Sequence, residues 1–317
     1  MAVKISIITP SYNQAEYLEQ TILSVLGQNY GNLEYIIIDG GSTDNSVEII
    51  KKYEKQLHYW VSERDSGQSA AINKGIQQAS GEIIAWLNSD DLYCENTLHI
   101  VSDLFEKNSE VDIVYGDVIN FDTKGKETRI TNQFEINDFF SRVSIHQPGV
   151  FWRRSLHAEF GLIDEKLFYC MDYDLWMPLF LNCKSMRTEK VLARFREHGH
   201  SKTGSKPIGL YNEYALVVSR FFNSLSENTW SKKLTASGIN YDKETKRYKL
   251  NEKYNESILS KIFWNYLQNC VETEYTKGDF LGVNRLFILN PHLLFHTKGL
   301  LIFLKTNSLF IFLRNKN

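Results

Sequence analysis

The sequence predicts an α/β fold in which a mainly parallel central sheet is flanked by helices and followed by a helical C-terminal extension. Short apolar strand patterns alternate with helix patterns between residues 4 and 118. The strand patterns are almost continuously apolar, as expected where both faces of a parallel sheet are covered. Beyond about residue 205 this alternation stops. We therefore expect one domain over residues 1–205 and a mostly helical extension over residues 206–317.

The individual elements can be placed from their periodicity and their stop signals. The first strand is short and β-branched and ends at Pro10. Helix patterns with apolar residues three or four positions apart separate it from the strands that follow. Strands are expected over residues 4–9, 35–38, 58–62, 82–87 and 111–118, with a further strand and a loop within residues 119–142. Helices are expected over residues 18–26, 47–53, 70–79, 98–105, 168–181, 211–225 and 258–267.

Polar residues gather at three of the expected strand ends. They are the segment Thr9–Asn13, Asp39 and the pair Asp90–Asp91. Ligands of open parallel sheets bind outside the carboxyl ends of the strands, so we expect these three groups to converge on one edge. For the aspartate pair alone, a hard-cation site and a simple strand end before a helix cap are both open.

Composition excludes several classes of function. The chain has 317 residues, and its 36 basic and 38 acidic side chains give a formal net charge of −2, which offers no electrostatic case for nucleic acid. Its four cysteines form no Cys-x-x-Cys pair, so neither a zinc knuckle nor a thioredoxin-type site is indicated. We expect no signal peptide and no transmembrane span, and hence a cytoplasmic setting.

The candidate chemistry follows from the carboxylates. No glycine-rich phosphate-binding loop follows a strand, so a divalent ion such as Mg²⁺ or Mn²⁺ on Asp90 and Asp91 would have to neutralise bound phosphates. His198 is a candidate additional ligand, although a single histidine is more often structural. If the nucleophile is a hydroxyl, a carboxylate can serve as its base, and Asp172 and Asp174 are the candidates. Residues two apart on a helix do not face each other, so only one should enter the site.

These segments together resemble family 2 glycosyltransferases of the GT-A fold, of the kind that build bacterial O-antigen, capsule or exopolysaccharide. The resemblance covers roughly residues 3 to 205. It rests on Thr-Pro-Ser-Tyr-Asn at residues 9–13, Asp-Gly-Gly-Ser-Thr-Asp at residues 39–44, Asp65-x-Gly67, Ala71-x-Asn73-x-Gly75 and Asn-Ser-Asp-Asp at residues 88–91. Met171-Asp172-Tyr173-Asp174-Leu175-Trp176 is similar to the family's Glu-Asp-x-Asp-Leu-Trp segment, and His198-x-x-Ser201 is similar to a further segment.

The resemblance implies inverting transfer of a hexose-type sugar from a nucleotide-diphosphate donor, with UDP-sugars favoured. Asp172 would be the base, Asp91 the main metal ligand, Asp90 close to the ribose, and His198 close to the metal or diphosphate. The donor would be contacted by Thr9, Pro10, Tyr12, Asn13, Asp39, Ser42, Asp65, Asn73, Asp90 and His146. The acceptor would be a hydroxyl of a glycan or a lipid-linked acceptor.

Two other functions fit the sequence less well than glycosyl transfer. A nucleotidylyltransferase should carry a Gly- and Arg-rich loop after its first strand, and residues 10–15 are not one. A non-catalytic nucleotide-sugar-binding module would have no need of a base such as Asp172. The C-terminal tail has no acidic residue after Asp279 and is rich in Phe and Leu, so it fits packing on the domain or peripheral contact with the inner face of the cytoplasmic membrane equally well.

Overall fold

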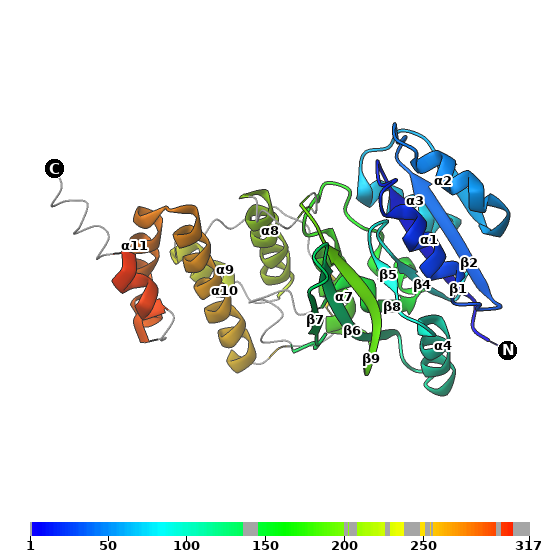
Figure 1. Cartoon of the computed structure of the whole chain (residues 1–317). Coiled ribbons are helices and arrows are strands. Elements are labelled where there is room, and N and C mark those ends of the chain that lie inside the picture. The colour runs from blue at the N-terminus through cyan, green and yellow to red at the C-terminus, as the bar shows by residue number, and fades with distance from the viewer. Residues whose placement is uncertain are drawn as a thin grey trace. The chain divides into compact units, whose positions relative to one another are not determined.

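The computed structural model divides the chain into two compact units, shown in Figure 1. The first comprises Met1–Gln133 and Ile145–Leu210, and the second Phe134–Ser144 and Tyr211–Asn317. The structure describes residues 2–135, 145–199, 202, 208–225, 229–237, 248–250, 254, 256–295 and 299–306. The expected domain boundary at residues 205 and 206 lies outside the described residues.

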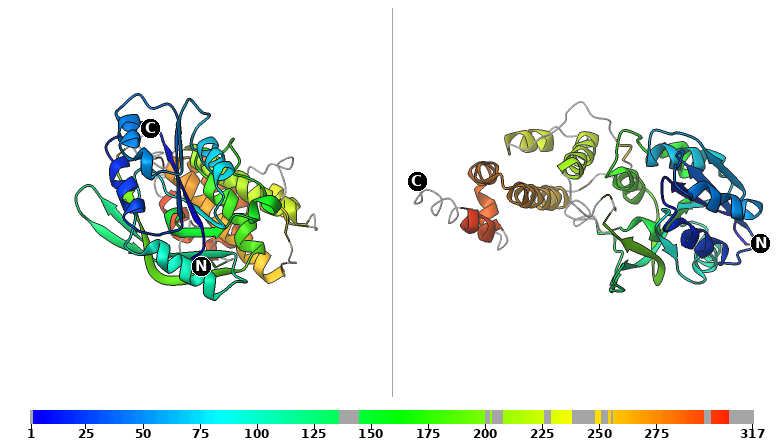
Figure 2. Two further views of the ribbon diagram at one scale, coloured as in Figure 1. Left: turned by 90° about the vertical axis from the view of Figure 1, so that its right-hand side faces the viewer. Right: turned by 45° about the horizontal axis from the view of Figure 1, so that its top comes forward.

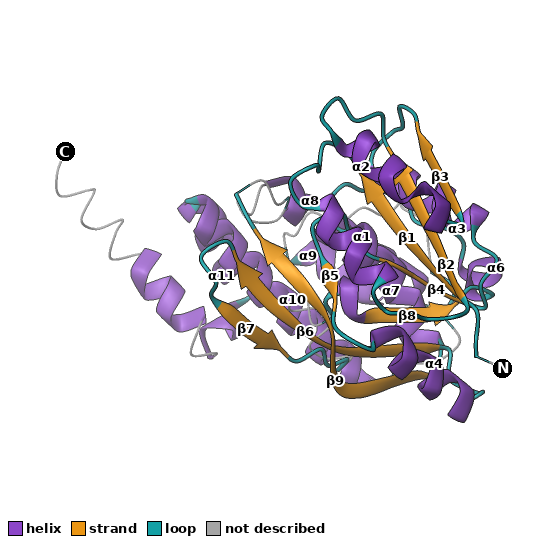
Figure 3. Ribbon diagram, turned by 45° about the vertical axis from the view of Figure 1, so that its right-hand side comes forward, coloured by secondary structure: helices purple, strands orange, loops and turns teal. Residues whose placement is uncertain are grey.

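The first half of the sheet is fully parallel. Its strands run in the order β3-β2-β1-β4, and Figure 3 shows them side by side. Their bounds are β1 (Ile5–Ser11), β2 (Leu33–Asp39), β3 (Tyr59–Ser62) and β4 (Ile83–Trp86). Every residue of β1 is buried, which explains why the strand is largely apolar and carries no charged residue.

The second half of the sheet is mixed. It continues from β4 in the order β8-β6-β9-β5, and β7 pairs with β6. Only β6 and β9 pair in parallel, while the β4–β8, β6–β8, β6–β7 and β5–β9 pairs are antiparallel. The strands are β5 (Leu92–Tyr93), β6 (Ile113–Asp122), β7 (Glu127–Ile130), β8 (Val150–Arg153) and β9 (Ser185–Glu197). The predicted α/β class with flanking helices is confirmed.

Helices cover both faces of the parallel strands, with α1 and α2 on one side and α3 on the other (Figure 2). The helix α3 approaches β1 closely at Gly75, where a Cβ atom would lie 2.4 Å from Cγ2 of Ile8. Only glycine fits there without displacing the strand. The helices of this unit are α1 (Leu18–Leu26), α2 (Ser46–Tyr53), α3 (Gln68–Gln78), α4 (Thr97–Lys107), α6 (Leu156–Phe160) and α7 (Met171–Asn182), with 3-10 turns η1 (Glu54–Gln56) and η2 (Gln147–Gly149).

Three buried tryptophans fasten α7 to the end of β4. The Trp176 ring of α7 stacks on the Trp86 ring of β4, with centroids 5.5 Å apart and planes 6° from parallel. Trp152 of β8 packs edge-on against both. Aromatic pairs of this kind add stability beyond the area that they bury. The start of α7 is therefore held close to the segment that follows β4.

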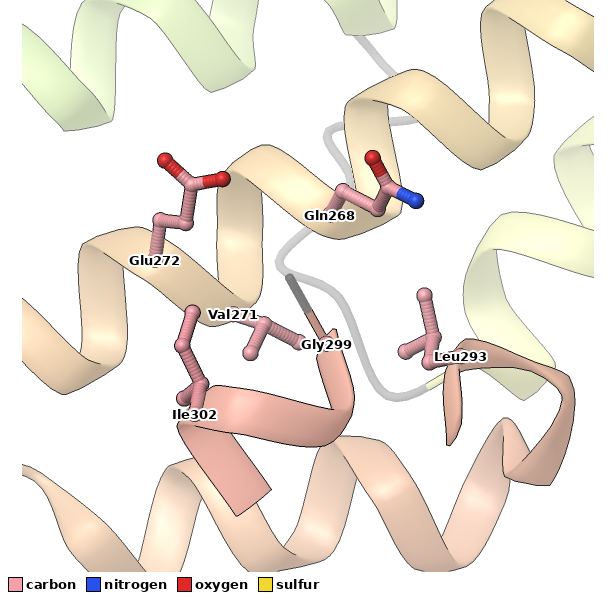
Figure 4. A pocket seen from close by; sticks show the side chains of 6 residues that line it. All are labelled: Gln268, Val271, Glu272, Leu293, Gly299 and Ile302. Atoms are coloured by element: carbon pink, nitrogen blue, oxygen red, sulfur yellow. The ribbon is translucent and has the colours of Figure 1, made fainter. Parts of the chain in front are cut away.

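The second unit is helical, and the expected helices over residues 211–225 and 258–267 are confirmed. Its elements are α8 (Ile208–Ser224), α9 (Thr229–Ala236), α10 (Glu256–Lys277), α11 (Phe280–Leu289) and η3 (Pro291–Phe295), with a further helix over residues 299–306. A pocket lies where residues 299–306 meet α10; its lining includes Val271, Ile302 and only two polar side chains, Gln268 and Glu272 (Figure 4). Within the described residues, no helix combines the length and the apolar character needed to cross a membrane.

Candidate active site

The polar residues at the strand ends do meet at one edge of the sheet. In the parallel register Ser11 pairs with Asp39, and Asp39 pairs with Ser62. On the other side of β1, Ile8 pairs with Trp86, the last residue of β4. The loops after all four parallel strands therefore start at the same edge, as the sequence predicted.

Asp39 is fully buried and holds the loop that follows it. Its carboxylate accepts hydrogen bonds from Ser42 N (2.9 Å), Ser42 Oγ (2.5 Å), Gly41 N (3.1 Å) and Ser62 Oγ (2.7 Å). The Ser42 hydroxyl in turn accepts from Asn13 N at 2.7 Å. Asn13 has a left-handed backbone, with φ 52°, and its side-chain oxygen accepts from Thr43 N at 2.8 Å. These residues fix the shape of two loops at the site.

The remaining residues at this end of the sheet differ in exposure. Thr9 and Pro10 are buried within β1, and the Thr9 hydroxyl lies 3.1 Å from the Tyr35 hydroxyl. Tyr12, just past the strand, is 60% exposed, so its ring can stack on a ligand. Asp65 accepts a hydrogen bond from Gly67 N at 2.8 Å and lies against the backbone of Gly40.

The two adjacent carboxylates at the end of β4 have different environments. Asp91 is fully buried, and its oxygens accept from Arg196 N (3.0 Å) and Asn88 Nδ2 (3.2 Å). Burial first, and the neighbouring Asp90 charge second, raise the pKa of Asp91 well above its usual value. Asp90 is 21% exposed, and its Oδ2 lies 2.9 Å from Nε2 of His198. Asp90 is thus the carboxylate that a ligand can reach.

His198 reaches this place through the pairing of two distant strands. Strand β9 runs antiparallel to β5, with Leu92 opposite Arg194, and ends one residue before His198. The imidazole packs against the Tyr17 ring at 4.8 Å. In the described part of the chain no group of three or more His, Cys, Asp or Glu side chains could hold a metal ion. Asp90 and His198 therefore offer two potential metal ligands.

A cluster of amides lies beside this pair; the sequence had marked Asn88, as the first residue of its Asn-Ser-Asp-Asp segment, but not Gln68. Asn88 accepts from Gln68 Nε2 at 2.7 Å and donates to Gln147 Oε1 at 3.3 Å. Gln147 itself donates to the Trp86 carbonyl at 2.6 Å. Lys202 Nζ donates to Gln68 Oε1 at 2.6 Å. For Gln68 itself, the sequence offered one signal, its position directly after Asp65-x-Gly67 and at the start of a helix.

Arg196 is a second residue that was missed, and it braces the aspartate pair. Its backbone N–H binds Asp91, and its Nε donates to the Asp90 carbonyl at 2.9 Å. The guanidinium lies over the rings of Tyr17 and Phe121 at 4.7 and 4.6 Å. Nothing in the sequence marked Arg196, because the contacts come from segments more than 70 residues away.

Asp172 and Asp174 differ as expected from their spacing. Asp172 lies in the first turn of α7, is partly exposed, and accepts from Tyr173 N at 2.7 Å. Asp174 is buried, at 3% exposure. Asp172 precedes Trp176 by one helical turn, so the stacking of Trp176 on Trp86 keeps it near the end of β4.

The other candidate residues have mostly protein partners. His146 N and Nδ1 lie 2.8 and 3.1 Å from Asn132 Oδ1, and burial lowers the pKa of His146, which favours the neutral ring. Asn73 uses its side-chain amide on Ile163 and Glu165. Ser201 lies outside the described residues.

Comparison with known proteins identifies the family. Residues 6–178 match the family described as Glycosyl transferase family 2. The chain belongs to glycosyl transferase family 2. An uncharacterized glycosyltransferase of Rickettsia conorii is 33% identical over 236 residues, which is 70% of this chain but only 39% of the relative's length. A putative teichuronic acid biosynthesis glycosyltransferase of Bacillus subtilis, TuaG, is 41% identical over 97 residues, covering 30% of this chain and 38% of that protein.

Solved structures show the same fold. The UDP-GlcNAc complex of S. aureus TarS 1-349 has a TM-score of 0.62 at 16% identity, covering 90% of this chain and 79% of TarS 1-349. Mannosyltransferase PcManGT from Pyrobaculum calidifontis, in complex with GDP-Man and Mn²⁺, has a TM-score of 0.53 at 15% identity, covering 96% of this chain and 86% of PcManGT. This family 2 glycosyltransferase therefore has the GT-A fold that its sequence predicted.

Proposed function

We propose that this chain is an inverting glycosyltransferase that moves a sugar from a nucleotide-diphosphate sugar, with UDP-sugars favoured, to a hydroxyl of a glycan or lipid-linked acceptor. The observation that carries the proposal is the pairing of His198 with the partly exposed Asp90 at the carboxyl edge of a parallel sheet, in a chain of this family. The UDP-GlcNAc complex of TarS and the name of TuaG support a nucleotide-sugar donor and a role in cell-surface polysaccharide biosynthesis, such as O-antigen, capsule or exopolysaccharide.

A divalent ion, Mn²⁺ or Mg²⁺, fits the potential ligand atoms at this edge of the sheet. An oxygen of Asp90 and a nitrogen of His198 lie 2.9 Å apart, and Asp90 is open to a ligand. Mg²⁺ is often held by one or two protein ligands together with substrate phosphates, so the remaining positions would belong to the diphosphate and water. When bound, the ion would neutralise the departing diphosphate. We assign Asp90 and His198 as its ligands.

This assignment changes the division of roles that the sequence suggested. Asp91 was expected to bind the metal and Asp90 to face the ribose. The buried Asp91 carboxylate is instead occupied by Arg196 and Asn88. We propose that Asp91 supports the segment that carries Asp90, and that Asp90 takes the metal role first given to Asp91.

The nucleoside would bind at the ends of β1, β2 and β3. The exposed Tyr12 ring can stack on the base, and Asp65 can accept a hydrogen bond from it. Asp39 would act mainly by fixing the loop at Ser42 and Asn13, because its oxygens already accept four hydrogen bonds. His146, neutral and half-buried beside Gln147, would border the sugar.

Asp172 would take the proton of the attacking hydroxyl. The acceptor oxygen forms a bond to the anomeric carbon while the bond from that carbon to the diphosphate oxygen breaks, and the electron pair leaves with the diphosphate. The anomeric configuration inverts in this single displacement. A carboxylate base suits such a step because proton transfer accompanies bond formation.

A screen of nucleotide sugars by thermal shift, with and without Mn²⁺, tests the proposal directly. A ligand that binds only the folded chain raises its stability in proportion to the logarithm of its concentration over Kd. The preferred donor should raise Tm, and Mn²⁺ should enlarge the shift. A chain that binds no nucleotide sugar under either condition would rule out the proposal.

For the C-terminal region we propose peripheral contact with an anionic membrane, such as the inner face of the cytoplasmic membrane. One face of α11 exposes Leu281, Ile288 and Leu289, at 71, 78 and 44%, together with Arg285. Residues 299–306 likewise expose Leu300, Leu301 and Leu304 beside Lys305. Exposed apolar side chains interspersed with basic ones are typical of helices that lie in a lipid interface.

A further inference from the structure

The helix α3 is attached to the segment that leads into α7. Ser69 and Asn73 are four residues apart, so they lie on one face of α3, and both are buried, at 5 and 4% exposure. Asn73 Nδ2 donates to the Ile163 carbonyl at 2.9 Å and to Glu165 Oε1 at 3.0 Å, and Asn73 Oδ1 accepts from Ile163 N at 3.0 Å. Both protons of its amide nitrogen and its oxygen are therefore used within the protein.

Ser69 holds the same segment nearer to Asp172. Its hydroxyl lies 3.1 Å from the Leu167 carbonyl and 2.8 Å from Sδ of Met171, the residue before Asp172. Two side chains of α3 thus fix the approach to α7 at Ile163, Glu165, Leu167 and Met171.

The same helix is fixed to the metal side of the site. Gln68, next to Ser69, donates to Asn88 at 2.7 Å, and Asn88 donates to Asp91. Further along α3, Gly75 brings the helix against Ile8 of β1 so closely that no side chain fits between them. These contacts fix the position of α3 relative to β1 and β4. They thereby also fix the position of the Ile163–Met171 segment that α3 binds.

We propose that Asn73 and Ser69 are positioning residues for the base Asp172, and that Asn73 does not contact the donor as its motif suggested. The inference rests on the proposed function, in which Asp172 accepts the proton. By holding the Ile163–Met171 segment, α3 sets the distance between Asp172 and the Asp90–His198 pair. A misplacement of about 1 Å at a reacting group can lower a rate about 100-fold.

The test compares Asn73→Ala with Gln77→Ala, which removes an exposed amide from the same helix. We expect Asn73→Ala to lower kcat by about 10- to 100-fold while the donor Kd, measured by calorimetry with Mn²⁺, changes less than threefold. Gln77→Ala should change neither. Weaker donor binding with unchanged kcat would identify Asn73 as a donor contact and overturn the inference, as would an unchanged kcat alone.

Ser69→Ala removes a single hydroxyl and provides the decision if Asn73→Ala does not fold. It should lower kcat in the same direction, and an unchanged kcat would contradict the inference. A double-mutant cycle then separates positioning from general damage: in an Asp172→Asn background, Asn73→Ala should have almost no further effect on kcat. Additive losses would show that Asn73 does not act through Asp172. Full activity of Asp172→Asn alone would instead refute the proposed base.

Discussion

The Nε2 atom of His198 lies 2.9 Å from Oδ2 of Asp90, although 108 residues separate them in the chain. The backbone of Arg196, near the end of β9, binds Asp91, so the end of β9 and the residue just after it contact both aspartates. One strand pairing thereby gives two neighbouring carboxylates unequal surroundings. The Asp91 carboxylate is hydrogen-bonded within the protein, whereas the Asp90 carboxylate is accessible to a ligand.

Replacing Asp90 should remove the metal dependence of donor binding. We expect Asp90→Ala to weaken Mn²⁺-dependent binding of a nucleotide sugar by more than about tenfold, because the ion loses its reachable carboxylate. Calorimetry with and without Mn²⁺ measures this. Asp103→Ala, which removes an exposed carboxylate from α4, is the control. An undiminished Mn²⁺ effect in Asp90→Ala would exclude Asp90 as a ligand.

Loss of the base should affect turnover and not donor affinity. We expect Asp172→Asn to lower kcat by about 10²- to 10⁴-fold, the usual contribution of a positioned acid or base, while donor Kd stays within a few-fold. Steady-state kinetics and calorimetry on the same preparation test both parts. A variant with normal kcat would assign proton transfer to another group.

Glu34 should contribute to stability in a defined pH window. Burial raises the pKa of Glu34, but hydrogen bonds from Lys4, Ser6 and Ser80 outweigh it and lower the pKa from 4.5 to about 2. The carboxylate therefore stabilises the fold fully above its unfolded pKa, and this stabilisation is lost as pH falls toward 2. It amounts to about 3 kcal/mol at pH 7. Urea unfolding of Glu34→Gln between pH 3 and 7 should show lower stability and a flatter pH dependence; a slope equal to wild type would contradict this.

The exposed face of α11 should govern vesicle binding. We expect Leu281→Glu with Ile288→Glu to reduce co-sedimentation with vesicles containing anionic lipid at least fivefold. Each substitution removes an apolar side chain that would enter the lipid interface and adds a negative charge that anionic lipid repels. Leu23→Glu changes a leucine of α1 that is 50% exposed and serves as the control. If all variants bind the vesicles equally, the membrane contact is refuted. If the wild type self-associates and only the double variant does not, the exposed face of α11 binds a second copy of the chain instead.

The parallel strands could be predicted because their residues carry their own signals. Strands β1, β2 and β4 are mainly apolar runs, and the polar residues at their ends mark the edge where they meet. The antiparallel half of the sheet could not be foreseen in the same way, since β5 has only two residues and exists through its pairing with β9.

Side-chain roles were harder to predict than strand ends. Nothing local distinguishes Asp90 from Asp91, because the difference comes from the return of β9 a hundred residues later. Asn73 illustrates the same limit. Its spacing in the motif suggested the donor, whereas its amide is bonded to a segment 90 residues further on.

The stacked indoles of Trp86 and Trp176 give the molecule a built-in optical reporter. Two nearly parallel chromophores 5.5 Å apart, with Trp152 edge-on to both, should couple their electronic transitions and produce a strong near-ultraviolet circular dichroism signal. The coupling decays steeply with separation. Any movement of α7 away from β4 during turnover would therefore be visible without a label, close to Asp172, the proposed base.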